Sequence, residues 1–341
     1  MLSKGKRSGL KDVASLAGVS TATVSRVLNG KGYASQEMRH KVLEAARQLH
    51  YQPNLQARSL RRRRSHSIGL LIPNLLNAYY TTLADAIGAL LTERGYQLLL
   101  SATRDDARLE EQVLNQLIGH DVDGILWVPV VGDQARLGYL ETQHTPAVSI
   151  VRKVEGNLID TIVFGDLAGS QAATQHLIQL GHRRIGYIGG DIAYSSNYDR
   201  WQGYLAALTS AGLPADEHLV RLGAVRSDWG ATATAELMHL PELPTALFVG
   251  SNAIFPGVIK VLRQFALGIP EQISLICFDD LDWFSYSDPP ISAVATSPNL
   301  LAEAAVDLLL RRVEEPTGLE RPPEFRELSF ELVLRRSTAP P

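Results

Sequence analysis

The sequence predicts a three-helix N-terminal head that a short linker joins to a larger α/β body with parallel sheets. Three observations support this fold class. Apolar stripes at helical spacing fill residues 10–49, apolar runs alternate with amphipathic stretches from residue 67 onward, and basic residues gather at the N-terminal end. A chain of 341 residues with 45% hydrophobic and 20% charged residues can hold two or three domains with sizeable cores.

Residues 10–29 have the pattern of two short helices joined by a tight turn. An apolar stripe fills residues 10–17, Gly18 can end this helix in a left-handed conformation, and Ser20 is a suitable N-cap for a second helix. Such a pair is a helix-turn-helix, whose second helix enters the DNA major groove. A helical hairpin at the edge of a larger core is the alternative. We favour DNA binding because the outward face of the second helix carries small groups and one guanidinium: Thr21, Ala22, Ser25, Arg26 and Asn29.

The charge of the chain is unevenly distributed. Residues 1–66 hold 14 Lys and Arg against 3 Asp and Glu, whereas the remaining 275 residues hold 19 against 33. A basic head on an acidic body attracts phosphates at one end only. A solvated basic tail would carry the same charge, but it would not contain three patterned helices, the third of which we expect at residues 35–49.

A linker is expected over residues 52–66, after a head that comprises residues 1–51. Pro53 stops the third helix, and Arg61–Arg64 form a cluster of positive charge. Four arginines can be a simple solvated segment, but beside a DNA-binding head we favour contact with phosphates.

From residue 67 onward, short apolar runs bounded by turn residues alternate with amphipathic stretches. Strand–helix alternation predicts parallel sheets covered by helices on both faces. Eight such runs exceed one comfortable sheet, so we expect two subdomains. The runs are residues 68–73, 96–102, 124–130, 147–151, 161–164, 184–190, 246–250 and 274–280.

Ligands of open parallel α/β sheets bind beyond the carboxyl ends of the strands. The residues that follow the predicted strands include arginines, carboxylates, amides, hydroxyls and aromatic rings, which together suit a small polyhydroxylated molecule. The candidate ligand-binding residues are Tyr79, Tyr80, Trp127, Arg152, Phe164, Asp166, Arg200, Ser251, Asn252 and Asp279.

The run DVASLAGVSTATVSRVLNG, with YQPNLQARSL at residues 51–60, resembles the N-terminal signature of the lactose/galactose repressor (LacI/GalR) family of bacterial transcriptional regulators. The resemblance implies a cytoplasmic repressor that binds a pseudo-palindromic operator as a homodimer, under the control of a small-molecule effector. We expect a dimer and not a tetramer, because the C-terminal RRSTAPP has no heptad repeat. One departure is Gly9, where the family usually has a Thr N-cap, and glycine caps only slightly less well.

The resemblance also implies roles for residues of the head and the linker. Thr21, Ala22 and Arg26 would read bases in the major groove. The linker would fold as a hinge helix on DNA, with Ala57 at the hinge contact and Leu60 inserted between bases to kink the operator. The other expected DNA contacts are Arg58 and, to phosphates, Ser20, Thr23, Ser25, Asn29 and Asn54.

For the body, the resemblance implies a periplasmic-binding-protein type 1 fold with two lobes. In that fold the chain crosses between the lobes three times, which we place near residues 164, 294 and 325. The expected lobes are residues 67–164 plus 295–325 and residues 165–294 plus 326–341. Four of the candidate ligand-binding residues match positions at which the family binds its effectors: Tyr79, Tyr80, Arg200 and Asp279.

Two departures from the family pattern bear on the effector. Ser251 and Asn252 stand where the family usually has Asn-Asp, and Arg152 stands where several sugar-binding members have an acidic group. One negative group fewer and one positive group more favour an anionic effector. We therefore expect a sugar acid, such as gluconate or a keto-gluconate, over a neutral hexose. The alternative is that Arg152 points to solvent or pairs with Glu155.

The sequence gives no support to an enzyme, a metal site or a cofactor. It has no phosphate-binding loop, nucleophile elbow or metal-ligand cluster, and Asp279 and Asp280 would point to opposite faces of a strand. Cys277 lies in an apolar run, where a buried hydrophobe is expected over a nucleophile. No membrane span or signal peptide is present, which argues against a solute-binding receptor that serves a transporter. The polar cleft argues against an architectural DNA-binding protein without an effector.

Overall fold

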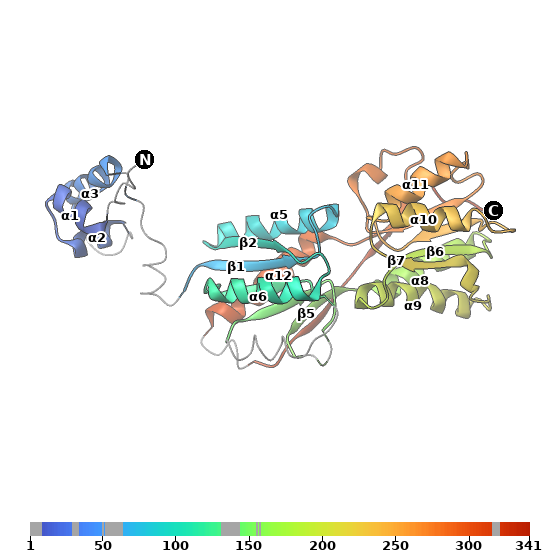
Figure 1. The fold of residues 1–341 in the computed structure, drawn as a ribbon, viewed down its shortest axis with the longest axis horizontal. Helices are drawn as coiled ribbons and strands as arrows, with labels where there is room; N and C mark the ends of the chain where they lie inside the picture. The colour runs from blue at the N-terminus through green and yellow to red at the C-terminus, as the bar shows by residue number, and fades with distance from the viewer. Residues whose placement is uncertain are drawn as a thin grey trace. The chain divides into compact units, whose positions relative to one another are not determined.

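Residues 9–28, 34–49, 51, 64–130, 144–154, 156, 158–315 and 321–341 are described by a computed structural model of the chain. The chain divides into two compact units, Met1–Ser65 and His66–Pro341, which we call the head and the body (Figure 1). Helices make up the head, and strands alternate with helices through the body. The predicted fold class is confirmed.

The head has three helices around a small core: α1 (Leu10–Ala17), α2 (Thr21–Leu28) and α3 (Gln36–Gln48). Each helix contributes one fully buried valine to this core: Val13, Val24 and Val42. Gly18 ends α1 with a φ of 66°, the left-handed conformation that glycine adopts without cost. The Gly9 N–H donates to Asp12 Oδ2 at 2.7 Å, which satisfies the backbone of the N-cap residue, whereas Gly9 has no side chain to cap the first turn.

The first sheet of the body forms the N-terminal lobe. Its strand order is β11-β5-β4-β3-β1-β2, and every pair is parallel. Helices α5 (Ala78–Glu93) and α12 (Pro298–Glu314) cover one face, and α6 (Ala107–Gly119) covers the other. The strands are β1 (Ser67–Ile72), β2 (Gln97–Ala102), β3 (Gly124–Trp127), β4 (Ala147–Ile150), β5 (Asp160–Phe164) and β11 (Phe325–Leu328).

The second sheet forms the C-terminal lobe, in the order β12-β10-β9-β8-β6-β7, with β12 antiparallel to β10. One face carries α8 (Asp166–Gln179) and α9 (Ser195–Ser210), and the other carries α10 (Ser227–Leu237) and α11 (Phe255–Gln264). Its strands are β6 (Ile185–Gly190), β7 (Val220–Gly223), β8 (Ala246–Val249), β9 (Ser274–Phe278), β10 (Ser292–Ala295) and β12 (Glu331–Val333), with short 3-10 turns at Glu217–Leu219 and Asp282–Phe284.

The strand pairing locates the three passages of the chain between the lobes. The chain leaves the first sheet after Phe164, returns after Ala295 to form α12, and leaves again after Leu328. We expected the last passage near residue 325. It comes three residues later, because residues 325–328 pair with β5 and so belong to the N-terminal lobe.

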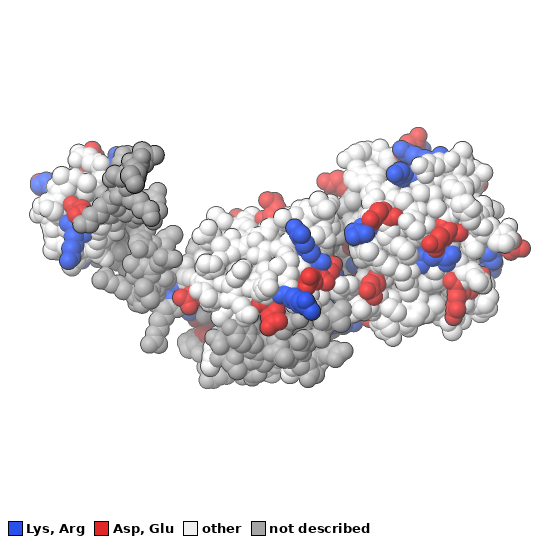
Figure 2. Space-filling view, in the orientation of Figure 1, with Lys and Arg blue, Asp and Glu red and all other residues white. Residues whose placement is uncertain are grey.

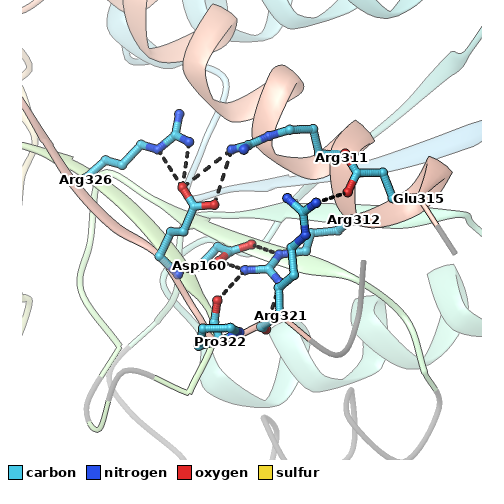
Figure 3. Close-up of polar contacts among 8 residues, drawn as sticks. Asp160, Arg311, Arg312, Glu315, Arg321, Pro322 and Arg326 are labelled. Carbon is cyan, nitrogen blue, oxygen red and sulfur yellow. Dashed lines mark hydrogen bonds and ion pairs between the residues drawn. The ribbon is translucent and has the colours of Figure 1, made fainter. Parts of the chain in front are cut away.

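A network of ion pairs fixes β11 and α12 to the N-terminal sheet (Figure 3). Arg312 in α12 donates to both carboxylate oxygens of Asp160 in β5, at 2.7 and 2.6 Å, and both side chains are less than a tenth exposed. Arg312 also donates to the carbonyl oxygens of Arg321 and Pro322, and Asp160 accepts the N–H of Glu324. Both members of this buried ion pair therefore hold the segment that leads into β11. Arg312 bonds its carbonyl oxygens, and Asp160 bonds one of its N–H groups.

Among the described residues, no helix has both the length and the apolar character needed to cross a membrane.

Candidate nucleic-acid interface and ligand cleft

Helix α2 presents the predicted DNA-reading residues on its outer side. Thr21, Ala22 and Arg26 are exposed, whereas Val24 and Val27 are buried in the core of the head. The helix begins after Ser20, whose Oγ accepts the Thr23 N–H at 3.1 Å and lies 2.9 Å from Thr23 Oγ1. Lys and Arg side chains lie on the visible, described surface of the head beside a few acidic ones, and both signs of charge also mix on the body (Figure 2).

The remaining predicted DNA contacts differ in what the structure says of them. Ser25 is half-buried on α2. The other five lie outside the described residues: Asn29, Asn54, Ala57, Arg58 and Leu60.

A narrow cleft opens in the body where the carboxyl ends of strands from both lobes meet. The N-terminal lobe contributes Pro73, Asn74, Asn77, Tyr79, Tyr80, Asp105, Val151 and Arg152. The C-terminal lobe contributes Ser196, Asn197, Arg200, Val225, Ser251 and Asp279. The structure thus brings together six of the ten predicted ligand-binding residues.

Arg200 is the centre of the C-terminal half of the cleft. It projects from α9, where Nε donates to Asp166 Oδ1 at 2.7 Å and Nη1 donates to the Gly250 carbonyl at 2.9 Å. Its guanidinium lies over the ring of Phe278, 3.7 Å from the ring centroid, and 3.6 Å from Asp279 Oδ2. Five donors in one plane are thereby held in a fixed orientation at the floor of the cleft.

The two carboxylates beside Arg200 are buried and differ in environment. Burial raises the pKa of Asp166 to about 6, against the opposing effect of Arg200. Burial lowers the pKa of Arg200, but the charges of Asp166 and Asp279 outweigh that effect, so the guanidinium stays charged. Asp279 has a φ of 67° and accepts hydrogen bonds from Thr296 Oγ1 at 2.9 Å and from Asn252 Nδ2 at 3.2 Å. Its carboxylate is therefore fixed from two sides.

Arg152 is the cation of the N-terminal half. Its Nη1 donates to Asp105 Oδ1 at 2.7 Å and to the Pro129 carbonyl at 2.9 Å. Its guanidinium lies 4.0 Å from the ring centroid of Tyr194, and the side chain is only 6% exposed. Arg152 therefore does not point to solvent, and its partner is Asp105. The alternative partner, Glu155, lies outside the described residues.

Tyr79 and Tyr80 supply the aromatic surface. They open α5, where the Asn77 side chain accepts the N–H of Tyr79 as the N-cap. Their rings meet edge to face with centroids 5.7 Å apart, and burial raises the pKa of both phenols. Both side chains stay neutral at physiological pH and can contact a sugar ring through one face or donate a hydrogen bond.

Four predicted ligand-binding residues do not line the cleft. Trp127 packs in the core between the sheet and α6, where its indole N–H donates to Glu110 at 2.7 Å. Phe164 packs in the core on the other face of the sheet. Asp166 and Asn252 lie one layer behind, where they hold Arg200 and Asp279. For Trp127 and Phe164 the prediction is not supported, because a strand directs alternate side chains to opposite faces and both face helices.

Several residues that line the cleft were not predicted individually: Asn74, Asn77, Asp105, Ser196 and Asn197. All five follow strands β1, β2 or β6, so their positions at carboxyl ends of parallel strands were a usable signal. Asp105 was the least accessible to that reasoning, since its partner Arg152 is 47 residues away in the chain.

Two family models match the chain. "Bacterial regulatory proteins, lacI family" covers residues 9–54, and "Periplasmic binding protein-like domain" covers residues 174–338. The ribose operon repressor of Escherichia coli (strain K12) is 34% identical over 90% of this chain and 94% of its own length. The transcriptional repressor PurR of Actinobacillus pleuropneumoniae serotype 3 (strain JL03) is 32% identical over 96% and 97%.

Solved structures agree with these relatives. The lac repressor dimer bound to operator and the anti-inducer ONPF has a TM-score of 0.87 and 26% identity, covering 98% of this chain and all of that one. The complex of the regulator CelR with cellobiose has a TM-score of 0.73 and 31% identity, covering 97% and 100%. The relatives named here are transcriptional regulators by name, and the two solved structures share the fold over nearly the whole chain. The chain therefore belongs to the LacI family of DNA-binding transcriptional repressors, which bind operator DNA as dimers and small-molecule effectors in a core of this kind.

Proposed function

We propose that this protein represses transcription from a pseudo-palindromic operator, which it binds as a homodimer in the cytoplasm, and that a small sugar or sugar acid in the cleft sets its operator affinity. The observation that carries the proposal is that Arg200 and Asp279 line one cleft together with Tyr79 and Tyr80. Asp166 lies behind Arg200 and fixes its guanidinium. Planar polar groups beside aromatic rings are what a sugar needs: the former bind its hydroxyls and the latter its apolar face.

In the head, Thr21, Ala22 and Arg26 read the major groove, because they are exposed on the side of α2 opposite the core. Ser20, Thr23 and Ser25 contact phosphates at the start of the same helix. We extend the proposal to residues outside the described ranges on the family resemblance alone. Asn29 and Asn54 contact phosphates, Arg58 contacts DNA, Ala57 lies at the hinge contact and Leu60 enters the central base step.

The effector acts through the two lobes. Because the cleft takes side chains from both of them, a ligand that contacts both favours one relative position of the lobes over others. In a dimer, that position sets the spacing of the two hinges and so the affinity for the operator. Coupling of this kind is reciprocal, so operator DNA changes the affinity for the effector by the same factor.

The charges of the cleft bear on the choice between a sugar acid and a neutral sugar. We expected an anionic effector because Arg152 adds a positive charge. In the structure that charge is paired with Asp105, and Arg200 lies beside Asp166 and Asp279. Two cations face three carboxylates, so the main reason for an anionic preference is lost. Of the two ligand classes we therefore favour the neutral sugar, which agrees with relatives named for ribose and cellobiose.

Selection of bound duplexes from a random DNA pool tests the DNA-binding half, and the selected site then serves to screen effectors. We expect a palindrome with a constant central step, and its release or tighter binding in the presence of one class of sugar. The variant Arg200→Lys keeps the charge but not the planar fork, so it should bind the same operator and lose the response. Sequence-blind, salt-sensitive binding alone would contradict the repressor proposal. An operator that responds to no sugar or sugar acid would contradict the effector half.

A further inference from the structure

Asp105 and Arg152 reach each other from two loops whose backbones are both in the left-handed region. Asp105 follows β2 and has a φ of 56°, and the preceding Arg104 has a φ of 55°. Arg152 follows Val151, which has a φ of 68°. For a β-branched residue such as Val151 this conformation is a genuine outlier. Backbone strain at a cleft persists where the surrounding structure enforces it, and here it turns both loops so that the two side chains meet.

The pair leaves part of its hydrogen-bonding capacity unused. The Nη1 of Arg152 donates to Asp105 and to the Pro129 carbonyl, and the ring of Tyr194 covers one face of the guanidinium. The Nε of Arg152 is buried and has no partner among the described residues, although a buried donor of this kind is normally bonded. The carboxylate of Asp105 is 30% exposed and lines the cleft beside it. The pair therefore combines a guanidinium that has an unused, buried donor with a partly exposed carboxylate, and both residues line the cleft.

A hydroxyl and a carboxylate of a ligand would interact differently with the Asp105–Arg152 pair. A hydroxyl both donates and accepts, so it can accept from the guanidinium of Arg152 and donate to Asp105. A carboxylate only accepts, so it can bind Arg152 but meets the like charge of Asp105 at close range. The nearby cation Lys153 does not relieve this repulsion, because it pairs with Asp199.

We propose that Asp105 is a specificity-determining residue of the cleft, which selects neutral sugars and rejects sugar acids by holding Arg152 and by repelling a ligand carboxylate. This inference rests on the proposed function, since it concerns the effector that the cleft takes. Under this proposal Arg152 binds the hydroxyl groups of a ligand, whereas its charge alone would predict that it binds an anionic group.

The test compares each sugar with the acid of the same carbon skeleton. Because the sugar is cyclic and the acid is open-chain, the change in their affinity ratio between variants reports the acid group. Isothermal titration of the full chain with D-ribose and D-glucose, and with D-ribonate and D-gluconate, gives the ratio of sugar-acid to sugar affinity. We expect the unaltered protein to prefer the sugar, and Asp105→Asn to raise the ratio at least tenfold in favour of the acid. Asparagine tolerates the left-handed backbone of this position, so the fold should persist.

Two variants complete the test. Asp121→Asn is the matched control: Asp121 also has a left-handed φ, 54°, and is exposed at the amino end of β3, so the ratio should not change. Arg152→Gln leaves Asp105 unopposed and should lower the ratio, the opposite sign to Asp105→Asn. It also provides the second measurement if Asp105→Asn does not fold.

The outcomes separate this inference from the proposed function. Sugar binding with a ratio that stays within twofold in both Asp105→Asn and Arg152→Gln would overturn the inference and leave the repressor proposal intact. Preference of the unaltered protein for the acid would do the same. Operator binding without affinity for any of the four ligands would overturn the sugar-effector half of the proposed function and this inference with it.

Discussion

Lys153 and Asp199 join the two lobes beside the cleft, with Lys153 Nζ donating to Asp199 Oδ2 at 2.5 Å. Lys153 follows β4 in the N-terminal lobe, whereas Asp199 belongs to α9 in the C-terminal lobe. The Lys153 N–H also donates to Ser195 Oγ at 2.7 Å, and the adjacent Arg152 lies over Tyr194. Three contacts between the lobes thus gather on two consecutive residues, next to the place where an effector would bind.

Removing the Lys153 side chain should weaken effector binding modestly. The pair is partly exposed, with side-chain exposures of 40% and 17%, and such ion pairs are worth roughly 0.5–1 kcal/mol. We expect Lys153→Ala to raise the Kd of the effector two- to fivefold at low salt, and the difference to shrink as salt screens the pair. Lys41→Ala, which removes an exposed pair with Glu37 in the head, is the control and should leave that Kd unchanged. Equal effects of both variants would contradict a role for Lys153 between the lobes.

Arg26→Ala should abolish most of the sequence preference of the head. A guanidinium that reads a base in the major groove is worth about 1–3 kcal/mol, which corresponds to roughly a 5- to 150-fold loss of operator affinity. Affinity for unrelated DNA should change far less. Titration of labelled operator and of a scrambled duplex at one salt concentration measures both. Arg336→Ala removes the same charge from the C-terminal lobe, where the side chain is 75% exposed, and should alter neither value.

Asp160→Asn should destabilise the body strongly. The change leaves Arg312 buried without its carboxylate, and breaking a buried ion pair from one side costs about 3–5 kcal/mol. Urea unfolding followed by circular dichroism measures the loss. Asp307→Asn removes the carboxylate of the exposed pair with Arg94 and should cost within about 0.5 kcal/mol. In the double variant with Arg312→Met, part of the lost stability should return. A double variant less stable than Asp160→Asn alone would contradict this account of the cost.

Two histidines of the C-terminal lobe should make stability fall in acid. His182 bonds through Nε2 to the Ala339 carbonyl and through Nδ1 to Thr245, and His176 contacts Thr338. Burial lowers the pKa of both below the ordinary 6.5. Below pH 6.5 the unfolded chain therefore takes up protons before the folded chain does, and the free energy of unfolding decreases until the folded-state pKa is passed.

The test measures the free energy of unfolding at pH 7.5 and at pH 5.5 for the unaltered protein and for the double variant His176→Gln with His182→Gln. The double variant should lose less stability between pH 7.5 and pH 5.5. Asp166 acts in the opposite sense, since its pKa is raised to about 6 and its contribution to stability falls as pH rises toward that value. Because Asp166 is present in both proteins, the difference between them isolates the histidines. Identical pH dependence in both would show that neither histidine matters.

The parts of the fold that the sequence predicted are those encoded locally. The helix-turn-helix follows from apolar spacing, Gly18 and Ser20 within twenty residues, and the central strands follow from continuous apolar runs. Four strands were missed: β7, β10, β11 and β12. Strand β10 is buried but only four residues long, too short to stand out as an apolar run. The other three have a different cause. They lie at the edges of the two sheets with their residues only half-buried or exposed, so they lack the continuous apolar run of a strand covered on both faces.

Pairing between distant residues was not predictable in the same way. The charge on Arg152 was read correctly from the sequence, but its partner Asp105 is on a different loop. Likewise, nothing near Trp127 in the chain shows that Glu110 on α6 accepts its indole N–H and draws it into the core. Residue type set which groups could bind a ligand, whereas the packing of helices on the sheet decided which of them face it.

The passages of the chain between the lobes also order events during synthesis on the ribosome. Helix α12 covers the N-terminal sheet, yet it begins at Pro298, 134 residues after β5 ends at Phe164. At about 5–20 residues per second, that sheet waits on the order of ten seconds with one apolar face incompletely covered. A nascent chain that ends within the C-terminal lobe would carry a complete head joined to an N-terminal lobe whose apolar face is still uncovered. Because such a fragment exposes the apolar face that α12 would cover, we expect it to aggregate or to be bound by chaperones more readily than the full chain.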